Sequence, residues 1–118
     1  MQKLDVVGRL FPQILSGKKT STIRWRELRI EPGLMTYLNE DHPNQSAIVW
    51  VTKCTDMPLL DVAAYLGKEK EWPDQVMLEG MQEHYPEIEL NSVVQLVEHL
   101  TPAQTLEYEK SNLSPSVV

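Results

Sequence analysis

The 118-residue sequence has little cysteine and no long apolar run. Its single cysteine, Cys54, cannot form an intrachain disulfide, which suits a protein of the reducing cytoplasm. No apolar run approaches the roughly 18 residues that cross a membrane as a helix, and the N-terminal residues lack the apolar core of a signal peptide. We therefore expect one cytoplasmic domain with no membrane-spanning segment.

Metal-ligand sets and nucleotide-binding loops are also missing. The histidines His42, His84 and His99 are scattered and share no spacing with Cys54 that would suit a metal ion. The sequence has neither a glycine-rich phosphate loop nor a dinucleotide-binding fingerprint. It therefore predicts neither a metal nor an organic cofactor, and it assigns no histidine to the site.

Positive charge is scarce overall but concentrated near the N-terminus. The formal net charge is −6. Residues 1–30 hold seven Lys and Arg against two Asp and Glu, whereas the remaining residues hold four against fifteen. A basic pole on an acidic chain favours a small anionic or polar ligand, or a brief RNA contact, over a long duplex.

Hydrophobic patterning predicts short strands and short helices in α+β order. We expect strands over residues 3–8, 19–26, 34–38, 47–52 and 93–97, and helices over residues 9–16, 56–66, 73–85 and from 102 onward. Residues 47–52 are apolar enough to be covered on both faces. Such short strands favour a small barrel or a strongly curved sheet. We assign residues 1–100 to one domain and residues 101–118 to a short helix and a tail that frays from Ser111.

The segment from Gly17 to Arg24 is the most distinctive stretch of the chain. Gly17 stands where a helix ends in a left-handed residue, and the alternation after it indicates a strand. Lys18, Lys19 and Arg24 crowd this one turn, which is costly unless an anion or a polar ligand meets them. The alternative interpretation is an ordinary basic strand edge, where lysines prevent unwanted strand pairing.

The pattern Gly17-x-Lys19-x-x-Thr22-x-Arg24 resembles the signature of the ASCH domain. The resemblance implies an α+β fold, a small PUA-like (ASCH) β-barrel of about five to six strands with flanking short helices. Many members of that family have a glutamate at the position of Thr22. The threonine version resembles the small bacterial ASCH proteins that hydrolyse N4-acetylcytidine to cytidine and acetate.

The resemblance implies a catalytic triad of Lys19, Thr22 and a glutamate that precedes the helix before Tyr85. Glu71 fits that glutamate, and Glu69 is the alternative; both could also be solvated loop charges. Thr22 offers a nucleophile, and Lys19 offers either a base or a fixed cation. Residues three apart on an ideal strand face opposite sides. We therefore expect Lys19 to lie in the turn after Gly17.

The sequence also suggests residues that hold a substrate. We assign substrate binding to Gly17, Lys18, Arg24 and Arg26, and to Trp72 as a platform on which a base could stack. The predicted function is an amidohydrolase that removes the acetyl group from N4-acetylcytidine or a related acylated nucleoside. The alternatives are an RNA-binding module or ribonuclease on the same PUA-like fold, and a non-catalytic ligand sensor or interaction domain. The oligomeric state is left open.

Overall fold

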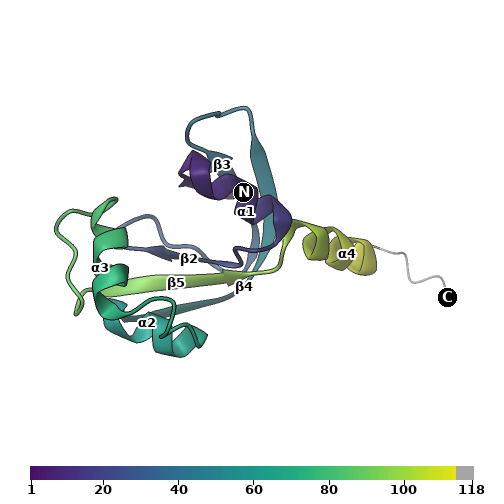
Figure 1. Ribbon diagram of the computed structural model, residues 1–118. Helices are drawn as coiled ribbons and strands as arrows, with labels where there is room; N and C mark the ends of the chain where they lie inside the picture. Colours follow the sequence, from purple (N-terminus) through teal and green to yellow (C-terminus); the bar gives the residue numbers. More distant parts are fainter. Residues whose placement is uncertain (114–118) are drawn as a thin grey trace. The chain divides into compact units, whose positions relative to one another are not determined.

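The computed structural model describes residues 1–113, which form five strands and four α-helices (Figure 1). The strands are β1 (Gln2–Val6), β2 (Ser21–Arg24), β3 (Gly33–Asn39), β4 (Ser46–Pro58) and β5 (Val93–His99). The helices are α1 (Phe11–Ser16), α2 (Leu59–Leu66), α3 (Asp74–Gln82) and α4 (Pro102–Leu113), with a short 3₁₀ turn, η1 (Gly8–Leu10), before α1. Every strand and helix expected from the sequence is present, so the predicted α+β class is confirmed.

The strands form one mixed sheet in the order β1-β3-β4-β5-β2. β1 runs parallel to β3, with Leu4 opposite Tyr37, and β3 runs antiparallel to β4, with Met35 opposite Val49. Because side chains alternate along a strand, this register puts Leu4, Met35, Tyr37 and Val49 among the buried side chains.

The chain divides into two compact units that are interleaved in sequence. Unit 1 contains Met1–Thr22, Ile30–Cys54 and the chain from Val97 onward, and unit 2 contains Ile23–Arg29 and Thr55–Leu96. Each unit has its own cluster of buried apolar side chains. No linker composition marks this division in the sequence, and the assignment of residues 1–100 to one domain did not anticipate it.

The core of unit 1 is built from alternating strand residues and from one face of α1. It contains Leu4, Val6, Phe11, Ile14, Ile30, Met35, Tyr37, Ala47, Val49, Val51 and Val97. The expectation that both faces of residues 47–52 are covered was wrong. Ile48 is 45% exposed and Thr52 is also exposed, so only the odd-numbered residues of this stretch face the core.

Helices α2 and α3 supply much of the core of unit 2. Leu59 and Val62 of α2 are buried with Met77 and Met81 of α3. As expected, α2 ends at Gly67, which adopts a left-handed φ of 70°. Two predicted boundaries were wrong. The strand β4 continues through Pro58, so no helix begins at Asp56, and α3 ends at Gln82 rather than at Pro86.

Helix α4 begins with the capping box that the sequence indicates. The Thr101 hydroxyl accepts a hydrogen bond from the Gln104 backbone N–H at 3.0 Å, and the Gln104 side chain accepts one from the Thr101 N–H at 3.0 Å. The helix continues to Leu113, two residues past the Ser111 from which the sequence predicts fraying, and the rest of the predicted tail, 114–118, lies outside the described residues. Within the described chain no helix is long and apolar enough to span a membrane.

Candidate functional site

The turn between α1 and β2 holds Lys19 outside the strand. Gly17 ends α1 with φ 82°, and its N–H donates to the Ile14 carbonyl. The Lys19 N–H then donates back to the Gln13 carbonyl at 3.0 Å, and β2 begins only at Ser21. The expectation that Lys19 belongs to the turn is therefore confirmed. The strand geometry that would separate Lys19 from Thr22 does not apply, because only Thr22 lies on the strand.

The side chain of Lys19 folds along the start of β2. Its Nζ is partly buried and donates to the Ser21 carbonyl at 2.7 Å. This bond brings the amine to the peptide unit between Ser21 and Thr22. Thr22 itself is only 5% exposed. A half-buried amine thus lies at the backbone beside a buried hydroxyl-bearing residue, a combination suited to nucleophilic or oxyanion chemistry.

A buried pair of polar side chains, Tyr37 and His99, lies in the same unit and was missed by the sequence analysis. The Tyr37 hydroxyl and His99 Nε2 are 2.8 Å apart, and the two rings meet edge to face at 5.3 Å between centroids. The backbone N–H of His99 donates to the Thr20 carbonyl at 3.0 Å, which ties β5 to the residue after Lys19. The pair is 62 residues apart in sequence, so no local spacing could have revealed it.

The partners of His99 define its protonation. Its Nδ1 is 2.8 Å from the Leu100 carbonyl, so Nδ1 carries the proton and Nε2 accepts a hydrogen bond from the Tyr37 hydroxyl. Burial lowers the pKa of His99 below its usual 6.5, the hydrogen bond to the Leu100 carbonyl opposes this, and the charge of Lys19 lowers the pKa further. Both ring nitrogens of His99 therefore have partners within unit 1, Tyr37 and the Leu100 carbonyl.

The other residues of this stretch that the sequence assigned to substrate binding are divided between the two units. Gly17 is half-buried and Lys18 is exposed, and both belong to unit 1. Arg24 and Arg26 belong to unit 2. The Arg24 side chain is 12% exposed and lies 3.5 Å from the Glu27 carboxylate, whereas Arg26 is exposed and its guanidinium stacks on Trp25 at 4.1 Å from the ring centroid.

The two candidate glutamates and the stacking tryptophan lie in the segment between α2 and α3 of unit 2. Glu69 and Glu71 are both exposed. Trp72 is half-buried and packs on the core of unit 2, and the Lys68 amine lies 4.6 Å from its ring centroid. The roles of Glu69, Glu71 and Trp72 in a site stay predictions.

Comparison with known proteins supports the fold and leaves the chemistry open. No family model and no curated protein matches the sequence. Among solved structures, the chain is similar to the crystal structure of a tyrosine-to-phenylalanine mutant of ZmASCH from Zymomonas mobilis. The TM-score is 0.63 at 11% identity, and the match covers 96% of this chain and 83% of that chain. The chain therefore has the ASCH/PUA-like fold, in which residues 1–113 form a five-stranded sheet and four α-helices.

Proposed function

We propose that the chain is an ASCH-domain amidohydrolase that removes the acetyl group from N4-acetylcytidine or a related acylated nucleoside. The observation that carries the proposal is the local geometry of Lys19 and Thr22. Lys19 lies in the turn with its amine on the Ser21 carbonyl, and Thr22 follows as a buried residue of β2. The similarity in fold to an ASCH-domain protein is consistent with membership in that family.

In the proposed reaction, the Thr22 oxygen attacks the acetyl carbonyl carbon and the carbonyl oxygen becomes an oxyanion. Collapse of this intermediate breaks the bond to N4, releases cytidine after N4 takes a proton, and leaves an acetyl ester on Thr22. Water then hydrolyses the ester to acetate and restores the hydroxyl. The proton of Thr22 passes to Lys19 if the amine is neutral. If Lys19 is charged, its ammonium stabilises the oxyanion instead, and Glu71 takes the proton of a water that attacks the acetyl carbonyl directly.

The third member of the proposed triad is Glu71, with Glu69 as the alternative. During hydrolysis of the acetyl ester on Thr22, this carboxylate would activate the water that releases acetate. Substitution of each residue by glutamine removes the basic oxygen and keeps the size of the side chain. We expect Glu71→Gln to slow turnover and Glu69→Gln to leave it unchanged; the reverse result would assign the role to Glu69.

The alternative of an RNA-binding module or ribonuclease has less support. The chain holds 17 Asp and Glu against 11 Lys and Arg, and this excess repels a polyanion. The proposed substrate is therefore a small nucleoside, and the proposed location is the cytoplasm, as the lone Cys54 suggests.

The test is an incubation of the purified chain with N4-acetylcytidine, with cytidine release followed by chromatography. Lys19→Ala and Thr22→Ala should each lose turnover by at least about a hundredfold, the usual scale of acid–base and nucleophile removal. Lys3→Ala, which removes an exposed cation of β1, serves as the control and should retain activity. Absence of turnover by the parent chain at high enzyme concentration would overturn the proposal.

A further inference from the structure

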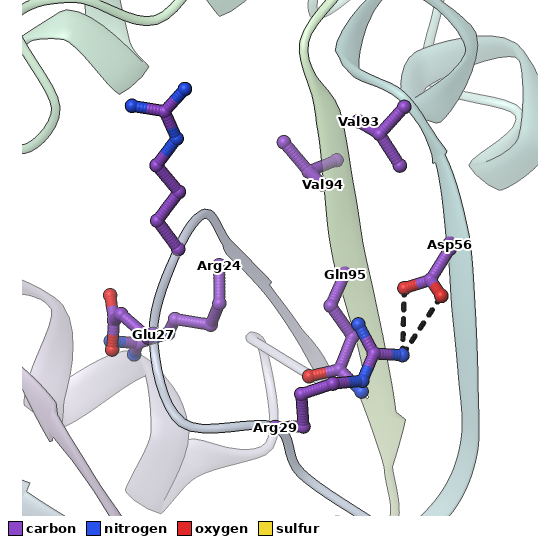
Figure 2. Close-up of a pocket in the computed structure, with 8 residues that line it drawn as sticks. Arg24, Glu27, Arg29, Asp56, Val93, Val94 and Gln95 are labelled. Atoms are coloured by element: carbon purple, nitrogen blue, oxygen red, sulfur yellow. Dashed lines mark hydrogen bonds and ion pairs between the residues drawn. The ribbon is translucent and has the colours of Figure 1, made fainter.

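A pocket of about 120 Å³ lies in unit 2, where the chain that follows β2 meets the start of β5 (Figure 2). Three arginines line it: Arg24, Arg26 and Arg29. On this measure a cavity holds one water molecule from roughly 10–15 Å³ upward, so the pocket can hold a group of several non-hydrogen atoms. Guanidinium groups around a space of this size are donors suited to an oxyanion.

Two carboxylates pair with two of these arginines. Arg29 Nη2 donates to both oxygens of Asp56, at 2.8 and 2.9 Å, as Figure 2 shows. Arg24 Nη1 lies 3.5 Å from Glu27, and the other Glu27 oxygen accepts a hydrogen bond from the Tyr85 hydroxyl. The two carboxylates thus offset the charge of two of the three arginines that line the pocket.

Arg26 supplies the remaining charge, and its backbone is strained. Among residues 1–113, Arg26 is the only non-glycine residue with a positive φ, 56°. L residues adopt this conformation rarely, and such conformations are concentrated at functional sites. Arg26 forms no ion pair with a carboxylate among these described residues. Its guanidinium carbon lies 4.1 Å from the Trp25 ring centroid, so its contact there is with an aromatic ring and not with a carboxylate.

We propose that this pocket binds the phosphate group of a small phosphomonoester, with Arg26 as the principal donor. Val93, Val94 and Gln95 of β5 also line the pocket, so the organic part of the ligand would lie against this strand. This inference uses neither Lys19 nor Thr22 and so does not rest on the proposed deacetylation, but it gives a phosphate as ligand to Arg24 and Arg26, which the sequence assigned to substrate binding.

The test is a titration of the full chain with inorganic phosphate. Binding is monitored through the ¹⁵N-edited NMR signals of the arginine side chains and of the Trp25 indole. Arg26→Gly removes the donors and also relieves the positive φ, so it should keep the fold. We expect it to weaken phosphate binding by about tenfold or more, as loss of a charge-assisted hydrogen bond does. Asp56→Asn removes a competing carboxylate and should tighten phosphate binding.

The control is Lys70→Ala, which removes an exposed cation of unit 2 outside the pocket and should leave the affinity unchanged. Parallel titrations with cytidine 5′-monophosphate and cytidine distinguish the sources of phosphate. Tighter binding of the monophosphate than of inorganic phosphate, with no shift of the pocket signals by cytidine, would identify a nucleotide, and equal binding would identify free phosphate. Phosphate affinity that is the same in the parent and in Arg26→Gly would overturn the proposal, as would the absence of any shift.

Discussion

A buried hydrogen bond joins the side chains of Tyr37 and His99 in unit 1. Replacing Tyr37 by Phe keeps the ring and removes the donor to His99 Nε2, which leaves a buried acceptor without its partner. We expect a loss of about 1–3 kcal/mol in the free energy of unfolding, measured by denaturant titration. The matched control is Tyr108→Phe, because Tyr108 is 40% exposed, and it should change stability by less than about 0.5 kcal/mol. Equal effects of the two changes would contradict the assignment.

The lowered pKa of His99 makes stability depend on pH in a defined direction. Because the folded chain favours neutral His99, the unfolded chain binds the proton more readily. The free energy of unfolding is highest above the pKa of His99 in the unfolded chain, about 6.5. It declines as the pH falls from there through the pKa of His99 in the folded chain. Unfolding free energies measured between about pH 8 and pH 5 should therefore decline toward acid.

The same pH series identifies the histidine responsible. His99→Gln should abolish most of the pH dependence between the two limits, whereas His84→Gln should preserve it, since His84 is exposed. A parent chain whose stability is flat across this range, or a His84→Gln variant that alone removes the decline, would refute the role given to His99.

The turn that ends α1 requires glycine for two reasons that can be separated. Gly17 has φ 82°, and a Cβ there would lie 2.8 Å from Thr101 Cγ2, whereas Gly67 has φ 70° with no atom within 4 Å of an added Cβ. Gly67→Ala should therefore cost only the backbone strain, about 1 kcal/mol. Gly17→Ala adds the steric clash and should cost about 2–4 kcal/mol by denaturant titration. Equal costs would show that the contact with Thr101 relaxes freely.

Element boundaries were predictable where local chemistry decides them. Gly17 and Gly67 end their helices, and Thr101 with Gln104 begins α4, because each signal acts within one turn of the chain. The extension of β4 through Pro58 was missed because Asp56 resembles a helix cap. Its carboxylate instead pairs with Arg29, 27 residues away, which no local pattern reveals.

At the scale of the whole chain, the sequence led to the α+β class and to the resemblance to ASCH domains, but it gave no sign of two interleaved units. Each unit collects segments that are distant in sequence, such as Ile23–Arg29 with Thr55–Leu96. For the same reason the candidate site was predicted only in part. Lys19 and Thr22 share a local motif, whereas His99 reaches the turn through a backbone bond to Thr20.

The charge of the whole chain predicts weak affinity for RNA. With a net charge of −6, the acidic remainder should repel a polyanion that the basic N-terminal residues attract. Fluorescence polarisation with a labelled single-stranded RNA should show no binding tighter than about 10 μM at roughly 0.15 M salt, because any contact at low salt is screened there. Submicromolar affinity at that salt concentration would favour the RNA-binding alternative.

The central claim is that Thr22 carries the acetyl group during deacetylation, and rapid-quench mass spectrometry tests it most directly. The chain is mixed with N4-acetylcytidine, quenched and digested, and the peptide that contains Thr22 is examined while cytidine is quantified. The account predicts an acetyl group on Thr22 that accumulates with the first cytidine released, and neither product from Thr22→Val, which keeps the shape of the side chain without its hydroxyl. Release of cytidine by Thr22→Val at the parent rate, or no release by the parent chain, would contradict it.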